Sequence, residues 1–178
     1  MMSTLYLLDA NVMIEANAAY YPPGRIPQFW LWLARMAKRG IVKVPAAILD
    51  EITPNIRDEP FTGWLSQNRQ DLLFDELTNY EKLNRVYREG YRFDQNSDSL
   101  QLEILQNDAE LVSYGLIDTG VRKVVTLESR QTPLDTLPSP RNRKIPLVCR
   151  LLDIPCITTF DLIRELDFRI PLSTSPAA

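Results

Sequence analysis

Short strand-like runs alternate with stretches of helical spacing along the chain. The runs lie at 5–8, 41–44, 121–127 and 155–159. Residues 5–8 are apolar at every position, which is typical of a strand buried on both faces, as in a parallel sheet covered by helices. The alternation therefore predicts an α/β fold, a three-layer α/β/α sandwich around a central parallel sheet of about four or five strands.

Between these runs, apolar residues recur at helical spacing, while prolines, glycines and charged residues mark helix ends. We expect a helix that starts at 11–16 and is broken at 20–24, one from 45 to near Pro54, and others at 27–38, 108–117, 145–152 and 160–168, with residues 59–95 in two further helical pieces. The proline-rich segment 128–143 is expected to be a surface loop. Because no linker or repeat interrupts the pattern, residues 1–170 are predicted to form a single domain, followed by a disordered tail at 171–178.

The chain contains no histidine, which excludes Ser-His-Asp and Cys-His catalysis and histidine-bound zinc. Its two cysteines, Cys149 and Cys156, lie in apolar contexts and are expected to be buried free thiols, as in a reducing compartment. No leader segment is recognisable, and no apolar run approaches the roughly 20 residues of a membrane helix. These features predict a cytoplasmic protein without a membrane span.

Four acidic residues are placed to share one crevice. Asp9 and Glu128 each follow a predicted strand, and ligands of open α/β sheets bind beyond the carboxyl ends of the strands. Glu51 and Asp108 lie on helices that frame the same crevice. Converging carboxylates raise each other's pKa unless a cation intervenes, and Mg²⁺ or Mn²⁺ suits a ligand set made of oxygen alone. The sequence therefore predicts a divalent-metal site that could hydrolyse a phosphodiester.

Each acid also has a purely structural interpretation. Asp9 and Asp108 suit the starts of helices, where such residues act as caps. Glu51 stands beside Asp50, and either residue is a candidate for the site if the other is merely solvated. Glu128 is otherwise an ordinary loop acid.

Two polar residues are candidates for supporting the acids. Asn11 either orients a carboxylate or only begins a helix. Thr126 either places its hydroxyl near the site or serves as a strand former.

The net charge of −3 means that any contact with nucleic acid has to come from a local patch. The loop after Glu128 supplies basic residues that could hold RNA phosphates, although they also suit an ordinary solvated loop: Arg130, Arg141, Arg143 and Lys144. Aromatic residues gather on the helix at 27–38, and this favours core packing or a dimer or partner surface over base stacking.

Four segments resemble the motifs of PIN-domain proteins, in particular a less-studied branch of the VapC-like bacterial toxin ribonucleases. They are Leu7-Leu8-Asp9-Ala10-Asn11-Val12, the run from Pro45 to Ile52 with Glu51, Asn107-Asp108-Ala109-Glu110, and Val125-Thr126-Leu127-Glu128. The run from Lys144 to Thr158 is also similar to that branch, so the likeness spans about residues 4 to 168.

This resemblance implies a Mg²⁺- or Mn²⁺-dependent endoribonuclease, often the toxin of a type II toxin–antitoxin pair, with a cognate antitoxin and a homodimeric state. Asp9, Glu51 and Asp108 would hold the ion, and Glu128 would complete its ligands or position the attacking water. All four acids would be catalytic.

The chain departs from the PIN pattern at three points. Glu128 replaces the commoner Asp, Ala10 lacks a hydroxyl, and Glu110 competes with Asp108 for the third acid. These departures favour the alternative of an inactive binding module with the same fold. A rival enzyme, a phosphohydrolase of the haloacid-dehalogenase type, needs a second Asp where Asn11 stands. Another rival, a phospho-acceptor receiver domain, needs paired acids in its first loop and a late lysine where Thr158 and Thr159 stand.

Overall fold

The computed structural model describes residues 4–52, 58–93, 105–128, 137–139 and 142–170. The predicted tail at 171–178 and the candidate RNA-binding residues Arg130 and Arg141 lie outside these ranges.

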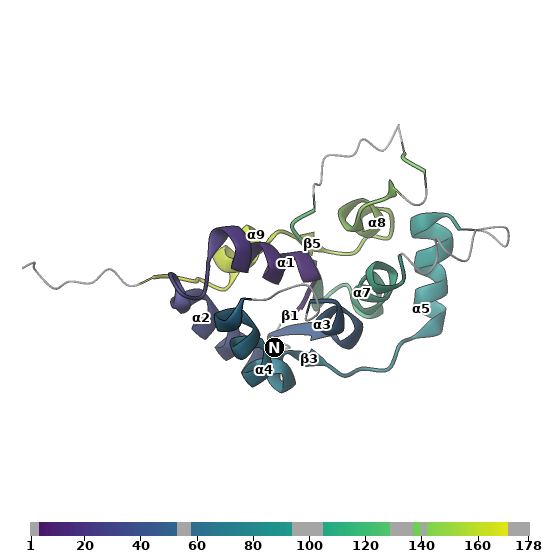
Figure 1. The fold of residues 1–178 in the computed structure, drawn as a ribbon. Helices are drawn as coiled ribbons and strands as arrows, with labels where there is room; N and C mark the ends of the chain where they lie inside the picture. The colour runs from purple at the N-terminus through teal and green to yellow at the C-terminus, as the bar shows by residue number, and fades with distance from the viewer. Residues whose placement is uncertain (1–3, 53–57, 94–104, 129–136, 140–141, 171–178) are drawn as a thin grey trace, which may run out of the picture.

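Within the described residues, five strands form one parallel sheet in the order β3-β2-β1-β4-β5 (Figure 1). They are β1 (Leu5–Leu8), β2 (Val42–Pro45), β3 (Leu73–Phe74), β4 (Arg122–Val125) and β5 (Cys156–Ile157). The predicted parallel α/β fold is confirmed. The prediction that all of 59–95 is helical is wrong at β3, because a strand of two residues carries no periodic pattern. Its pairing with β2 places Leu73 opposite Val44.

Helices cover both faces of the sheet and complete the predicted three-layer sandwich. They are α1 (Ala10–Glu15), α2 (Pro27–Lys38), α3 (Ala46–Ile52), α4 (Glu59–Leu72), α5 (Tyr80–Arg85), α7 (Gln106–Ile117), α8 (Ile145–Leu151) and α9 (Thr159–Glu165), with two π-helical segments, η1 (Ala16–Tyr20) and η3 (Val86–Tyr91). Helices α2 and α4 pack together and against β2, whereas α7 packs against β1 and β4 and α8 against β5 (Figure 1).

The strand order changes direction at β1. The chain first adds β2 and β3 on one side of β1, then returns to add β4 and β5 on the other side. Leu8 at the end of β1 lies opposite Val125 at the end of β4. The crevice beyond these two carboxyl ends is the switch point at which open α/β sheets bind ligands.

The aromatic residues of α2 belong to the core. Phe29, Trp30 and Trp32 are buried, with Trp30 only 2% exposed. The Trp30 ring meets Phe61 of α4 edge to face with centroids 5.1 Å apart, and its indole N–H donates to the carbonyl of Tyr21. The suggestion that these aromatics form a dimer or partner surface is therefore wrong for these side chains, because they are already packed inside the chain.

Both cysteines are free thiols, as predicted, but only Cys149 is buried, since Cys156 is partly exposed. Among the described helices, none has the length and apolar character that crossing a membrane requires.

Candidate functional site

Asp9 lies at the carboxyl end of β1 and is 7% exposed. Its backbone N–H donates to the carbonyl of Val125 over 2.9 Å, which extends the pairing of β1 with β4 by one residue. Its carboxylate Oδ2 accepts a 2.8 Å hydrogen bond from the hydroxyl of Thr126. Although Asp9 is at the N-cap of α1, its side chain makes no capping hydrogen bond among the described residues. The structure thus directs this carboxylate toward the crevice and β4 rather than toward the helix.

Asn11 and Thr126 tie the loop after β4 to the start of α1. The Thr126 hydroxyl accepts from the side-chain amide of Asn11 over 3.1 Å and from the backbone N–H of Glu128 over 3.1 Å. The Asn11 carbonyl oxygen accepts from the backbone N–H of Leu127 over 2.9 Å. Both predicted supporting residues therefore lie beside Asp9 and fix its hydrogen-bond donor in place.

Glu128 lies on the same loop and is held by the start of α8. Its Oε2 accepts a 2.7 Å hydrogen bond from the backbone N–H of Ile145, and its Oε1 pairs with the Lys144 ammonium at 3.0 Å. Lys144 remains 62% exposed at its side chain, so one face of the ammonium is open to solvent. Of the two candidate basic residues that the structure describes, Lys144 contacts a site acid directly.

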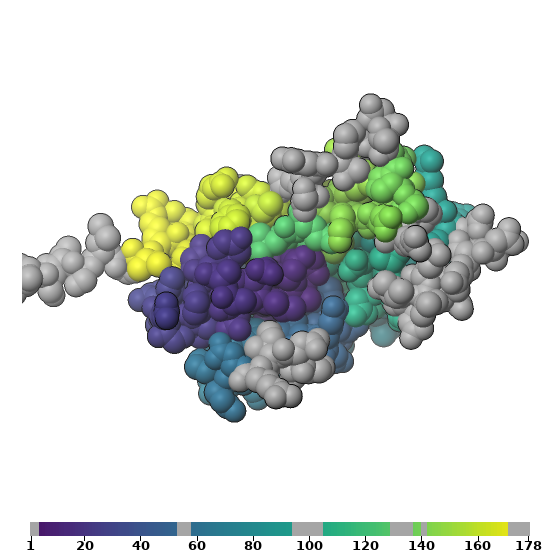
Figure 2. Space-filling view, turned by 45° about the horizontal axis from the view of Figure 1, so that its top comes forward, coloured from purple at the N-terminus to yellow at the C-terminus, as the bar shows by residue number. Residues whose placement is uncertain are grey.

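Glu51 and Asp108 come from two helices that meet at the crevice. Asp108 lies in the first turn of α7, and the neighbouring Asn107 donates its side-chain amide to Glu51 Oε2 over 3.1 Å. Asp50, the alternative to Glu51, instead pairs with Arg69 of α4. The segments that carry the four acids lie side by side on one face of the molecule (Figure 2).

Glu110, the alternative to Asp108, faces a different set of partners. It accepts hydrogen bonds from the hydroxyls of Thr78 and Tyr114 over 2.6 and 2.9 Å. The pKa of Asp108, by contrast, is raised by the charges of all three other predicted acids. The geometry therefore selects Asp108 as the member of this motif that faces the crevice.

Burial and mutual repulsion raise the pKa values of the two inner acids. Burial raises the pKa of Asp9 to about 6, with Glu128 and Glu51 adding to the rise and hydrogen bonds from Thr126 and the Ala10 backbone opposing it. Burial also raises the pKa of Asp108 to about 7, with further contributions from the charges of Asp9, Glu128 and Glu51. Lys144 lowers the Asp108 value, but not enough to restore an ordinary carboxyl.

The donor set suits a hard divalent cation, because it consists of carboxylate oxygens. In the described residues, however, no group of three or more acidic or cysteine side chains lies close enough to hold an ion together. Glu128 and Glu51 each have a protein partner, Lys144 and Asn107. The inner pair, Asp9 and Asp108, is where uncompensated negative charge would most favour a cation.

Arg143, another candidate for binding RNA, is 4% exposed. Its guanidinium donates to the carbonyls of Gly90 over 2.6 Å and of Pro138 over 3.3 Å. It therefore joins the segment before α8 to the end of η3 and offers little surface to a phosphate.

A residue that the sequence did not single out, Tyr91, also reaches this region. It ends η3, its side chain is fully buried, and the charges of Asp108 and Glu128 act on its hydroxyl. No sequence signal marks it, because an aromatic residue near the end of a helical stretch is an ordinary core residue.

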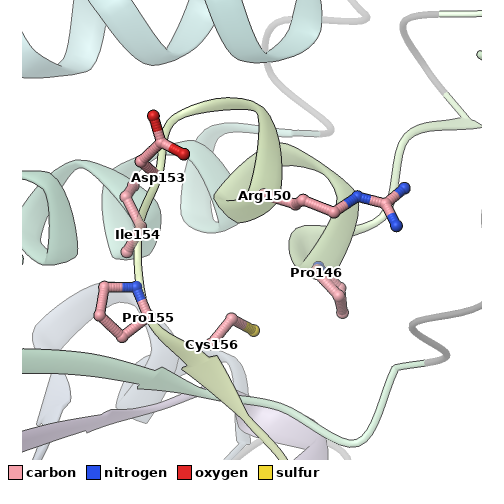
Figure 3. A pocket seen from close by; sticks show the side chains of 6 residues that line it. All are labelled: Pro146, Arg150, Asp153, Ile154, Pro155 and Cys156. Atoms are coloured by element: carbon pink, nitrogen blue, oxygen red, sulfur yellow. The ribbon is translucent and has the colours of Figure 1, made fainter. Parts of the chain in front are cut away.

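A pocket of about 470 Å³ lies between α8 and β5, lined by Pro146, Arg150, Asp153, Ile154, Pro155 and Cys156 (Figure 3). None of the four predicted acids lines it. Figure 3 shows its two charged side chains, Arg150 and Asp153, pointing away from each other. The pocket is therefore separate from the acid site.

Comparison with known proteins gives one match. The family described as a domain of unknown function (DUF4411) matches residues 6–170. No curated protein matches the chain, and no solved structure matches it. The matching family's description names no activity.

Proposed function

The chain belongs to the DUF4411 family, and from its acid site we propose that it is a Mg²⁺- or Mn²⁺-dependent endoribonuclease. One observation carries the hydrolytic part of this proposal. Asp9 is buried and Asp108 is partly buried, they come from separate elements, and the pKa of each is raised by burial and by the charges of other site acids, with Asp9 contributing to the rise at Asp108. Holding two such carboxylates out of water without a cation costs stability, and this favours a functional site.

RNA as the substrate rests on the resemblance to PIN-domain ribonucleases. The same resemblance supports a role as the toxin of a type II toxin–antitoxin pair in the cytoplasm, with an antitoxin partner and a homodimeric state. These finer assignments belong to the proposal and have their own tests, which are co-purification with an antitoxin and the mass of the protein in solution.

A cation bound between the acids would lower the pKa of a water molecule and offset charge on the phosphate. The residues that would hold it are Asp9 and Asp108, with Glu51 and Glu128 as the outer acids. Thr126 donates to Asp9 Oδ2 and so holds that carboxylate in place at the site. This hydrogen bond also favours the ionised form of Asp9, which metal binding requires.

Lys144 has two roles in this proposal. In the described structure its ammonium neutralises Glu128, and its open face is available to a phosphate oxygen. A phosphate arriving at Lys144 would draw the ammonium away from Glu128 and release that carboxylate toward the site.

The direct test mixes the purified protein with a labelled single-stranded RNA and Mn²⁺ at pH 8. We expect cleavage that a chelator stops and that Asp9→Asn reduces by about 100-fold or more. The matched pair Glu51→Gln and Asp50→Asn tests adjacent acids of α3, of which only Glu51 faces the crevice. Cleavage that persists at the full rate in Asp9→Asn, or equal losses in the two α3 variants, would contradict the proposal.

Two observations favour a second candidate, a binding module without hydrolysis. Glu128 already has a cationic partner in Lys144, and no three described acids are gathered tightly enough to hold an ion. Such a module would bind RNA and leave it intact with Mn²⁺ present. Hydrolysis of a small phosphate monoester instead of RNA would point to another class of phosphohydrolase.

A further inference from the structure

The hydroxyl of Tyr91 is buried without a hydrogen-bond partner. Tyr91 has no exposed surface, and among the described residues no donor or acceptor lies within reach of its oxygen. Buried hydroxyls in folded proteins are almost always hydrogen-bonded, so an orphaned one calls for a specific explanation. Within the described residues, no protein group satisfies this hydroxyl.

The position of Tyr91 indicates what that group is. Segment η3 contacts both α7 and α8, the two helices whose first residues lie at the acid site. Asp108 lies in the first turn of α7, and the first residue of α8 donates its backbone N–H to Glu128. The charges of these two acids, after burial, raise the pKa of Tyr91 well above its ordinary value. The phenol therefore stays protonated and can donate a hydrogen bond in the region where the charges of Asp108 and Glu128 act on it.

The scaffold around Tyr91 holds the ring firmly. The carbonyl of the preceding residue, Gly90, accepts a 2.6 Å hydrogen bond from Arg143. A Cβ atom at Gly90 would lie 2.6 Å from Val148 Cγ1, so the backbone passes directly against α8. The Tyr91 ring also packs nearly parallel to that of Phe93, with centroids 6.0 Å apart. The hydroxyl is thus placed by rigid contacts on several sides.

We propose that Tyr91 is a positioning residue of the acid site, whose hydroxyl donates a hydrogen bond to an oxygen that the site holds together with a divalent cation. That oxygen belongs to the Asp108 carboxylate or to a water molecule bound beside it. The inference rests on the proposed metal binding and adds to it a neutral donor that no sequence motif contains. Without the cation the hydroxyl has no hydrogen-bond partner, so it stabilises the protein only when the metal ion is bound.

The test compares Tyr91→Phe with Tyr114→Phe and the wild type during titration with Mn²⁺ at pH 8, with the melting temperature as the readout. Tyr91→Phe removes a hydroxyl that has no partner, so without metal it is expected to melt at the same temperature or higher. It is expected to need roughly 3- to 10-fold more Mn²⁺ for the same stabilisation, as the loss of one hydrogen bond implies. Direct calorimetric titration with Mn²⁺ gives the same ratio independently.

Tyr114→Phe is the matched control on the neighbouring helix α7. Its hydroxyl donates to Glu110 over 2.9 Å and lies 3.2 Å from the hydroxyl of Thr78, so its removal leaves real partners unsatisfied. This variant is expected to melt at a lower temperature without metal and to keep the wild-type dependence on Mn²⁺.

The outcomes separate this inference from the function on which it rests. A wild type that Mn²⁺ does not stabilise would overturn the proposed metal site and the role of Tyr91 with it. A wild type that Mn²⁺ stabilises, alongside a Tyr91→Phe protein with the same Mn²⁺ dependence, would overturn the role of Tyr91 alone. A lower melting temperature of metal-free Tyr91→Phe would also contradict it, since the hydroxyl would then have a structural partner.

Discussion

Replacing Asp108 by asparagine should stabilise the metal-free protein at alkaline pH while removing its response to metal. Asp108 is partly buried, and its pKa rises from 3.8 to about 7 in the folded chain. An acid whose pKa is raised by folding costs stability increasingly as the pH rises from its unfolded pKa to its folded pKa, and the cost is complete above the folded value, because the native state binds the proton more tightly than the unfolded chain does. The amide has nearly the same shape and no charge, so that cost disappears.

The size of the gain follows from the shift in pKa. A rise of about three units corresponds to about 4 kcal/mol at 1.36 kcal/mol per unit, which is an upper bound since Asp9 shares the repulsion. Asp108 also lies in the first turn of α7, where losing a negative charge costs about 0.3–1 kcal/mol. The buried amide keeps part of the cost of desolvation. The net expectation is a free energy of unfolding about 2–3 kcal/mol higher than in the wild type at pH 8.

Urea unfolding of both proteins at pH 8 and pH 4, without metal, measures this difference. At pH 4 the wild-type carboxyl is protonated in the folded state and partly protonated in the unfolded chain, so the gain should fall below about 1 kcal/mol. The same samples with Mn²⁺ should show stabilisation of the wild type only. An Asp108→Asn protein that is less stable than the wild type at pH 8 would refute the placement of this carboxylate in a repulsive, buried cluster.

Three further predictions concern the same molecule. First, the free energy of unfolding of the metal-free wild type should fall as the pH rises from about 4 to about 7 and then level off, because Asp9 and Asp108 both have raised pKa values. Mn²⁺ should stabilise the protein more at about pH 8 than at about pH 5. Denaturant titrations across this pH range check both trends. Second, the Lys144→Met variant should bind Mn²⁺ about 3- to 10-fold more tightly in a calorimetric titration, because the substitution removes the ammonium that competes with the metal ion for Glu128. Weaker binding would show that the lysine does not compete with the ion. Third, Gly115→Ala should destabilise the fold by about 1–3 kcal/mol, because its Cβ would lie 2.8 Å from a valine methyl of β4. Gly63→Ala should instead raise stability by about 0.5–1 kcal/mol, because no atom lies within 4 Å of the added Cβ. Equal effects of the two substitutions in thermal unfolding would contradict the close contact at Gly115.

The fold was predictable because its main signal is local. The continuous apolarity of β1 and the acid that ends it are readable from six residues of sequence, and strand order then places Asp9 next to Thr126. Strand β3 was not predictable, because two residues gain strand geometry only from their pairing with β2.

The candidate site was predictable only in part. The sequence indicated which acids follow strands or begin helices. In the structure, the charges of neighbouring site acids raise the pKa values of Asp9 and Asp108. The pairing of Glu128 with Lys144, the burial of Arg143 and the unsatisfied hydroxyl of Tyr91 depend on how distant elements pack. No pattern in the sequence reports such contacts, because each joins segments whose spacing along the chain varies freely.

The hydrogen bond from Thr126 to Asp9 spans 117 positions of the chain. During synthesis, the first carboxylate therefore leaves the ribosome long before the strand that completes its surroundings, at 5–20 residues per second. A nascent chain that stops short of β4 contains Asp9, Glu51 and Asp108 but lacks both their shared scaffold and the fourth acid. Any chemistry that needs all of them can begin only after most of the polypeptide has been made.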